Sequence, residues 1–264
     1  MGTILVGTSG YSYTEWIGPV YPPSTKPEVF LDLYAHMFSS VELNFSYYRM
    51  PSALQLEHLM GQSGPSLVFS IKANDSLTHT IDPTSWRDSA HTFTDAVETL
   101  AASGQLGAVL LQFPYSFHYD VDQRRYLDAL LKELTHLPLA VEFRNGQWYN
   151  NRVLDSLRTR QVALSSVDLP PLKGLPPVMD VSTSSLAYIR LHGRNSETWW
   201  GSDSASRYDY LYSDKELESW VDRIKAIASR ASTVLVYFNN HRRGQAVQNA
   251  QTLRSMLVKA GLSA

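Results

Sequence analysis

Eight short apolar segments recur along the chain, and almost every one ends on a polar or charged side chain. The segments are Thr3–Ser9, Ser39–Asn44, Leu67–Lys72, Ala108–Gln112, Leu139–Arg144, Val162–Asp168, Ala187–His192 and Thr233–Asn240. Stretches with the 3.6-residue period of a helix lie between most of them. Because a strand and a helix alternate eight times, the pattern predicts an α/β protein of the (β/α)8 TIM-barrel class.

The length of the chain fits one such barrel, which usually takes about 250 residues. No linker rich in Gly, Ser or charge divides the 264 residues, so we predict a single TIM-barrel domain over residues 1–264. The connection Leu169–Ser185 contains four prolines and has no helical period. We therefore expect an irregular, Pro-rich connection in place of the sixth helix.

Start and stop signals support the helices between the strands. We predict helices over Glu28–Phe38, Ala53–Met60, Ser89–Ser103, Asp122–Leu134, Asn151–Arg160, Asp214–Ser229 and Gly244–Lys259. Ser52 is a typical N-cap, and Ser213 with Glu216 three residues later forms the pattern of a capping box.

Polar residues fall on one face of several predicted strands, since side chains alternate between the two faces with period two. In the fifth strand Glu142 and Arg144 share one face, whereas Val141 and Phe143 share the other. The second, third and seventh strands repeat this pattern, and their polar faces carry Glu42, Asn44, Ser70, Lys72, Tyr188, Arg190 and His192. The apolar faces must meet the helices, so the polar faces are expected to line the interior near the mouth of the barrel, where catalysis occurs in this fold.

These positions supply the candidate site. The predicted catalytic residues are Glu42, Lys72, Glu142 and His192, and the predicted substrate-binding residues are Asn44, Tyr47, Arg49, Gln112, Arg144, Trp148, Asp168, Arg190, Asn239 and Asn240. Glu142 would act as general base, Lys72 or His192 as acid or electrophile, and Arg144 and Arg190 as an anion clamp. Lys72 could instead form a Schiff base. A structural ion pair between Glu42 and Lys72 is the alternative interpretation.

Aromatic residues are concentrated in the connections that follow strands, which favours stacking against a ring-shaped ligand. Trp16 and Tyr21 are expected to pack the loops instead. We expect the ring of the ligand to lie against Trp148 or Tyr47. Its anionic group should lie near Arg190, His192 and Asn240, where the last helix begins at Gly244 and offers free backbone N–H groups.

Composition removes several classes of site. The chain has no cysteine, and its net charge is −2, which does not favour nucleic acid as the partner. No apolar run reaches about 18 residues, so we expect no membrane span and a cytoplasmic location. No cofactor is predicted. A divalent metal held by Glu42, Glu142, Asp168 and His192 remains an alternative, but no metal ligand is assigned.

Several motifs together resemble those of the YecE-like family, also called domain of unknown function 72. They are Gly7-Thr8-Ser9-Gly10-Tyr11-Ser12-Tyr13, Val41-Glu42-Leu43-Asn44, Phe69-Ser70-Ile71-Lys72, Leu111-Gln112-Phe113-Pro114, Ala140-Val141-Glu142-Phe143-Arg144, Tyr188-Ile189-Arg190-Leu191-His192-Gly193 and Phe238-Asn239-Asn240. The resemblance implies a TIM barrel and no settled activity. Members often carry a His after the strand-five Arg, where this chain has Asn145.

Three functions follow from this reading. The first is an enzyme that uses acid and base residues at the barrel mouth on a polar, ring-containing substrate, either sugar-like or phosphorylated. The second is a metal-dependent phosphodiesterase or nuclease similar to the barrel endonucleases, with aromatic side chains stacking on bases. The third is a non-catalytic module that binds a small polar or anionic ligand. The oligomeric state is not predicted.

Overall fold

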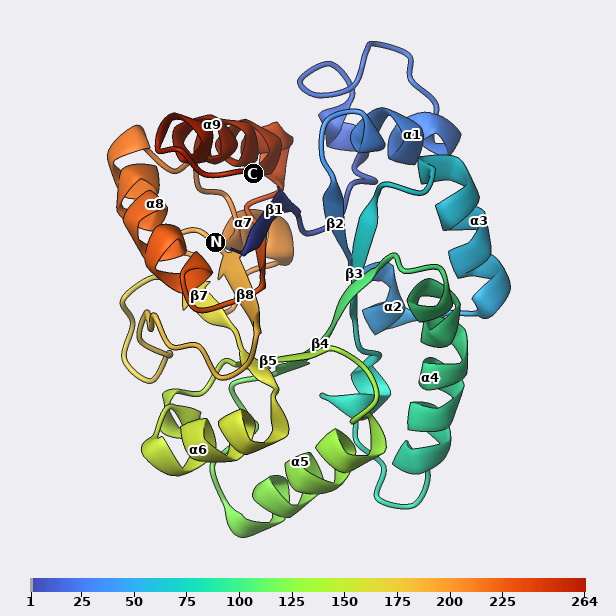
Figure 1. Ribbon diagram of the computed structural model, residues 1–264, viewed down its shortest axis with the longest axis vertical. Helices are drawn as coiled ribbons and strands as arrows, with labels where there is room; N and C mark the ends of the chain where they lie inside the picture. Colours follow the sequence, from blue (N-terminus) through green and yellow to red (C-terminus); the bar gives the residue numbers. More distant parts are fainter. Residues whose placement is uncertain (1) are drawn as a thin grey trace.

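Two parallel sheets form the centre of the molecule (Figure 1). The computed structural model describes residues 2–264, apart from the side chains of residues 204 and 205. One sheet has the order β2 (Ser40–Leu43), β3 (Val68–Lys72), β4 (Leu106–Phe113), β5 (Leu139–Phe143) and β6 (Ala163–Leu164). The other has the order β1 (Thr3–Thr8), β9 (Thr233–Phe238), β8 (Leu186–Leu191) and β7 (Ser166–Asp168).

Helices surround the strands (Figure 1). They are α1 (Phe30–Ala35), α2 (Phe45–Tyr48), α3 (Ala53–Ser63), α4 (Trp86–Ala102), α5 (Val121–Glu133), α6 (Asn151–Arg160), α7 (Ser204–Arg207), α8 (Asp214–Ala228) and α9 (Gln245–Lys259). The predicted caps are confirmed, since the Ser52 side chain accepts from the Gln55 N–H and Ser213 with Glu216 forms a capping box. The longer predicted helices match to within a few residues. The first does not, because Pro27–Val29 forms a separate 3-10 turn before α1.

The prediction of one continuous sixth strand is wrong. The strand is split at Ser165 into β6, which pairs with β5, and β7, which pairs with β8. The side chain of Thr183 explains the split, because its hydroxyl accepts from the Leu164 N–H and donates to the Val162 carbonyl, both at 2.7 Å. The Thr183 hydroxyl thus forms hydrogen bonds with a backbone N–H and a backbone carbonyl that would otherwise pair with a neighbouring strand.

The connection between β7 and β8 contains no helix or strand among its described residues, which confirms the predicted irregular segment. The Ser166 hydroxyl donates to the Met179 carbonyl at 2.7 Å, so this segment is hydrogen-bonded against the sheet edge. At the opposite edge, Ser9 forms a single parallel bridge with Glu42, and the Gly10 N–H donates to the Glu42 carbonyl at 2.8 Å. The Ser9–Glu42 bridge thus joins an edge of one sheet to an edge of the other, and the arrangement is TIM-like.

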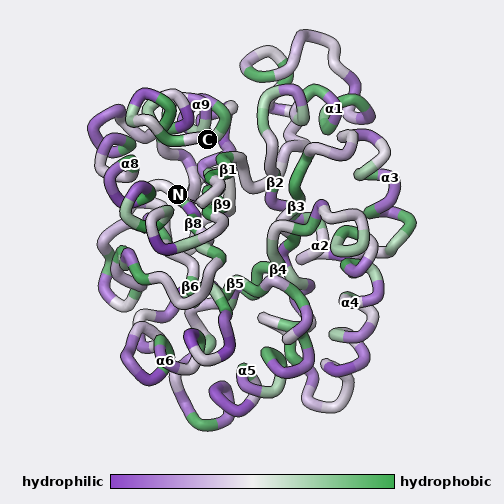
Figure 2. Tube along the Cα trace, in the orientation of Figure 1, coloured by the Kyte–Doolittle hydropathy of each residue, from purple (hydrophilic) through white to green (hydrophobic). Residues whose placement is uncertain are grey.

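The two faces of the strands pack into separate apolar clusters, as the alternation predicts. Val141, Phe143 and Ile189 belong to a large core that includes the helices, whereas Ala140 and Tyr188 belong to a small cluster between the sheets. In Figure 2 the central strands are mostly hydrophobic, and hydrophilic residues are concentrated on the surrounding helices. Among the described residues, no helix combines the length and apolarity needed to cross a membrane.

Candidate functional site

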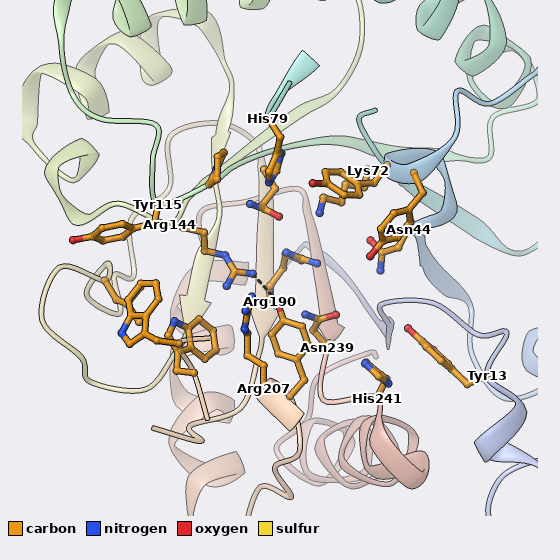
Figure 3. Close-up of a pocket in the computed structure, with 18 residues that line it drawn as sticks. Tyr13, Asn44, Lys72, His79, Tyr115, Arg144, Arg190, Arg207, Asn239 and His241 are labelled. Atoms are coloured by element: carbon orange, nitrogen blue, oxygen red, sulfur yellow. Dashed lines mark hydrogen bonds between the residues drawn. The ribbon is translucent and has the colours of Figure 1, made fainter. Parts of the chain in front are cut away.

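A pocket of about 440 Å³ opens where the strands end at their carboxyl side. Its size suits one small molecule. Figure 3 shows that its side chains converge on a common space from many elements. The lining residues are Tyr13, Asn44, Tyr47, Tyr48, Lys72, His79, Gln112, Pro114, Tyr115, Arg144, Leu175, Arg190, Trp199, Trp200, Arg207, Tyr208, Asn239 and His241.

The residues predicted from the sequence fall into three groups. Those that line the pocket are Asn44, Tyr47, Lys72, Gln112, Arg144, Arg190 and Asn239. Glu42, Glu142 and His192 are fully buried against these side chains and do not line the pocket. Arg49, Trp148, Asp168 and Asn240 are absent from the lining. The strand ends therefore converge as the alternation predicts, but the charged residues divide into a lining and a buried layer behind it.

Glu42 accepts three hydrogen bonds in a fully buried position. Its Oε1 accepts from the Ser9 hydroxyl and from Arg190 Nη2, and its Oε2 accepts from the Tyr188 hydroxyl, all at 2.7 Å. A buried carboxylate needs such partners to offset its desolvation. Glu42 pairs with Arg190 and makes no ion pair with Lys72 among the described residues, so the alternative of a Glu42–Lys72 pair is wrong.

Glu142 lies between two guanidinium groups. It accepts from Arg144 Nε, and its Oε2 accepts from Arg190 Nη1 at 2.7 Å. Burial raises the pKa of this carboxyl, but Arg144, Arg190 and His192 outweigh burial and hold the pKa well below its ordinary value. Because a strongly stabilised carboxylate is a weak base, Glu142 suits the role of a counter-ion better than that of a general base.

His192 is a neutral, fully buried imidazole. Burial and the nearby Arg144 lower its pKa to about 3. The Asn239 amide nitrogen lies 3.0 Å from Nδ1, and Nε2 lies 3.4 Å from Glu142 Oε2. These contacts assign the proton to Nε2, so that Nδ1 accepts from Asn239 and Nε2 donates to Glu142. His192 therefore orients the buried layer and is not a cation available to a ligand.

Lys72 is the titratable amine of the pocket. Its Nζ lies 4.0 Å from the centroid of the Tyr47 ring, within cation–π distance. Among the described residues it forms no ion pair, although Asp and Glu partners are found for many other basic side chains. Burial, Arg190 and Arg144 lower its pKa to about 7, against opposing contributions from Glu142 and Glu42. A large fraction of the amine is therefore neutral at neutral pH.

The segment between β8 and α8 supplies the side chains opposite Lys72. Tyr208 accepts from Arg144 Nη2 at 3.4 Å, and the Arg144 guanidinium lies 5.5 Å from the Trp199 ring centroid. Burial raises the pKa of Tyr208, but Arg144 and Arg190 outweigh it and lower the pKa below the ordinary value. Arg207 donates to the Ser202 carbonyl through Nη2, while its buried Nε has no partner among the described residues.

Several lining residues were not among the candidate site residues. His79 and Arg207 were not predicted at all. The aromatic residues belong to the loop aromatics expected to stack on a ligand, but no periodicity fixes the direction of their side chains; they are Tyr13, Tyr48, Tyr115, Trp199, Trp200 and Tyr208. The signal shared by the aromatic residues is their position in connections that follow strands. Burial lowers the pKa of His79 to about 4, with a further contribution from Lys72.

The predicted residues outside the lining have structural partners. Trp148 is 1% exposed, and its ring stacks on Phe143 at a centroid distance of 4.5 Å. Asp168 accepts two hydrogen bonds from Arg194, each at 2.7 Å. Asn240 donates to the Tyr210 carbonyl at 2.7 Å. The expected ring contact at Trp148 and the expected anion contact at Asn240 therefore have no counterpart in the pocket.

Arg49 lies at a separate surface groove near α3, together with Ser52 and His58. The two residues expected to pack the first loop, Trp16 and Tyr21, are buried as predicted. Across the described part of the chain, no group of three or more His, Asp and Glu side chains is arranged to hold a metal ion.

Known proteins match this chain over nearly its whole length. The profile of the family described as "Protein of unknown function DUF72" matches residues 5–263. The UPF0759 protein YunF of Bacillus subtilis (strain 168) is 27% identical over 269 residues, covering 96% of this chain and 94% of that protein. Both matches extend over nearly the whole chain.

Solved structures show the same arrangement. A DUF72 family protein from Thermotoga maritima has a TM-score of 0.87 and 35% identity, with 97% of this chain and 99% of that chain covered. One from Enterococcus faecalis V583 has a TM-score of 0.85 at 24% identity, covering 97% of this chain and 96% of that chain, and supports the fold alone. Because the family profile and a relative of 35% identity both cover nearly the whole chain, the chain belongs to the DUF72 family.

Proposed function

We propose that the protein is an enzyme whose pocket binds a ring-bearing, anionic metabolite such as a phosphorylated sugar, with Lys72 as the reacting side chain. The observation that carries this proposal is the composition of the lining. Lys72, Arg144, Arg190 and Arg207 contribute to it, whereas none of the described lining residues is acidic. The same cavity thus contains a lysine amine that can react and guanidinium groups that can bind an anion.

The charges around the pocket do not cancel. Arg190 donates to both buried carboxylates, and Arg144 donates to Glu142. Two carboxylates therefore face these two guanidiniums, while Lys72 and Arg207 have no carboxylate partner among the described residues. An anionic group would find positive charge already fixed in position, which is the arrangement that stabilises anionic groups without reorganisation.

Aromatic side chains supply the surface for a ring. Tyr115 and Trp200 meet edge to face at a centroid distance of 5.2 Å, and both are partly exposed at the pocket. Tyr47 lies under the Lys72 amine. Flat, weakly polar faces of this kind favour sugar rings and heteroaromatic rings.

Two further groups that line the pocket differ in their protonation. Tyr208 has a lowered pKa and can act as an acid, whereas His79, with a pKa of about 4, is neutral at pH 7 and can accept a hydrogen bond. This assignment moves the acid role from His192 to Tyr208 and the base role from Glu142 to the neutral form of the Lys72 amine.

Binding is tested by thermal shift with glucose 6-phosphate, AMP and neutral glucose. We expect the two phosphates to raise the melting temperature and glucose to have a smaller effect. Arg207→Gln should reduce the phosphate response, and Arg158→Gln, a change on the exposed side of α6, should leave it intact. Stabilisation by glucose alone would contradict the proposal.

Turnover is tested by incubating a panel of phosphorylated sugars with the protein and following products by phosphorus NMR. Lys72→Met serves as the matched inactive protein and should lower any conversion by about 100-fold or more, the usual contribution of a positioned acid or base. Binding of these compounds with no conversion in any case would favour the non-catalytic binding module.

We also propose that the strands close into one (β/α)8 TIM barrel within a single domain. The support comes from the two sheet edges, where Ser9 bridges to Glu42 and Ser165 joins β6 to β7. The large apolar core also runs from Ile4 to Leu262. A single cooperative unfolding transition by two different probes would be expected.

A further inference from the structure

We propose that Lys72 forms a Schiff base with an aldehyde or ketone that carries a ring and an anionic group. The inference rests on the proposed function, since the same pocket must bind the ring and the anion. It names the bond that forms there and restricts the substrate class to carbonyl compounds.

The backbone of Lys72 is held in place, whereas its amine forms no ion pair among the described residues. Lys72 is the last residue of β3 and pairs in register with Leu110 of β4. Its carbonyl accepts from the Ser46 hydroxyl at 2.5 Å. Beyond this fixed point the side chain extends into the pocket, where Figure 3 shows the amine pointing into the space shared with Asn44 and Arg190.

The surroundings of the amine favour a nucleophile. A lysine paired with a carboxylate stays protonated and has no lone pair to donate. Lys72 has no such partner among the described residues, and the guanidiniums of Arg144 and Arg190 oppose a further positive charge beside them. With a pKa of about 7, half of the amine is neutral at that pH and can attack a carbonyl carbon.

The reaction conserves atoms and charge. The lone pair of Lys72 Nζ attacks the carbonyl carbon, a C–N bond forms, and the C=O π electrons move to oxygen. The oxygen takes one proton while the attached nitrogen gives one up, which yields a neutral carbinolamine. When the hydroxyl oxygen takes a second proton, the C–O bond breaks, water leaves, and the lone pair of the nitrogen forms the C=N bond. The product is a protonated imine, and no oxidant or reductant is consumed. The Tyr47 ring that lies 4.0 Å from Nζ can stabilise the cationic imine.

The neighbouring groups decide which carbonyl compounds fit. Arg144 and Arg207 line the same cavity as Lys72, so an anionic group can be bound while the carbonyl reaches Nζ. Trp199 and Tyr208 also line this cavity, and their rings meet edge to face at a centroid distance of 6.1 Å. A ring linking the carbonyl to the anion is therefore the shape expected.

Pyridoxal 5′-phosphate is a suitable probe, because it combines a ring, a phosphate and an aldehyde. The protein is incubated with a limiting amount of the probe, reduced with borohydride, digested and mapped by mass spectrometry. We expect Lys72 to be labelled at least roughly 10-fold faster than Lys132 at about pH 7, because an ordinary lysine with a pKa near 10.4 is almost fully protonated there. Lys132 is the reference, since its side chain is 70% exposed and its amine pairs with Asp128 at 2.8 Å, in contrast to the unpaired amine of Lys72 among the described residues.

The pH dependence of the labelling rate and two lysine variants test whether the label is on Lys72. The labelling rate of Lys72 should reach half of its maximum near pH 7, and the label should be lost from that peptide in Lys72→Arg. Lys132→Arg should leave the Lys72 label unchanged. Labelling of Lys72 that is no faster than that of Lys132, or that still rises steeply above pH 9, overturns the inference.

Pyridoxine 5′-phosphate, which has the ring and phosphate but no aldehyde, separates this inference from the proposed function. If it raises the melting temperature while pyridoxal 5′-phosphate fails to label Lys72, the Schiff base is wrong and the anion-binding pocket stands. If neither it nor the other phosphates stabilise the protein, the proposed function fails as well.

Discussion

Arg190 of β8 donates from Nη2 to Glu42 Oε1 of β2 across 2.7 Å, although the two strands belong to different sheets. The same guanidinium donates from Nη1 to Glu142 of β5. One side chain thus ties together the ends of three strands. Because both terminal nitrogens are used in this way, Arg190 is a structural cation although it lines the pocket, and in the proposed function the ligand is bound by Lys72, Arg144 and Arg207.

Replacing Glu142 by Gln should be strongly destabilising. The substitution keeps the shape of the side chain but leaves Arg144 and Arg190 short of a buried counter-charge. We expect a loss of about 3–5 kcal/mol in the free energy of unfolding, the usual result of breaking a buried pair. Urea denaturation measures it.

Asp155→Asn is the matched control for that change. Asp155 pairs with Arg158 on the exposed side of α6 at 2.9 Å, and exposed pairs contribute at most about 1 kcal/mol. Equal losses in the two variants would show that the buried layer does not depend on the charge of Glu142.

Stability should rise with pH through the titration of Lys72. Its pKa is about 7 in the folded protein, below the ordinary value of 10.5. Between these pH values the unfolded chain binds more protons than the folded protein, so the free energy of unfolding increases with pH in that window. Lys72→Met removes this dependence.

The measurement is urea denaturation of wild type and Lys72→Met between about pH 6 and pH 10. We expect the variant to be most favoured relative to wild type at the acidic end, with the advantage shrinking toward the alkaline end. A constant difference across the range would mean that the pKa of Lys72 is not lowered.

Two tryptophans should differ strongly in how much they contribute to stability. Trp148 is packed against Phe143 and donates from its indole N–H to the Phe117 carbonyl at 2.7 Å. Trp148→Ala should therefore cost about 3–5 kcal/mol of stability. Trp200 is 52% exposed at the pocket, so Trp200→Ala should cost less than about 1 kcal/mol.

Ligand binding distinguishes the same pair. Trp200→Ala should weaken the thermal shift caused by AMP, since it removes part of the aromatic surface. Trp148→Phe, which keeps an aromatic ring in the core, should leave that shift unchanged. If Trp148→Phe weakened the shift and Trp200→Ala left it unchanged, Trp148 would be the ring contact that the sequence predicted.

Gly193 should tolerate no side chain. Its φ is +90°, and an added Cβ would lie 2.6 Å from Tyr210 Cβ. Gly201 has a φ of +75° but open space around it. Gly201→Ala should therefore cost only the backbone strain of about 1–2 kcal/mol, and Gly193→Ala should cost more. Thermal unfolding of both variants measures the difference, and similar losses would refute the role of the Tyr210 contact.

Most of the correctly predicted pocket residues followed from the alternation of side chains along the strands. The alternation identified Glu42, Lys72, Arg144 and Arg190 as neighbours because a strand with one apolar face has only one other face on which to place charge. It could not assign partners. Whether Glu42 pairs with Lys72 or with Arg190 depends on how the strands stagger around the centre, which no single strand encodes.

The alternation along strands does not predict where the side chains of loop residues point. Trp148 and Trp200 both follow strands, yet one fills the core and the other borders the pocket. No periodic pattern fixes where an irregular segment directs its side chains, so His79 and Arg207 gave no signal. The split of the sixth strand has a similar origin, since it depends on a hydroxyl of Thr183 some 20 residues further along the chain.

The pairing of β1 with β9 has a consequence for synthesis on the ribosome. The strands β2 to β6 pair with neighbours that are close in the chain, so that sheet can form as its residues emerge. β1 leaves first, but its partner begins at Thr233. β1 therefore stays without its β9 partner until residues 233–238 have been made, and closing that loop is a late, slow event in the folding of the sheet.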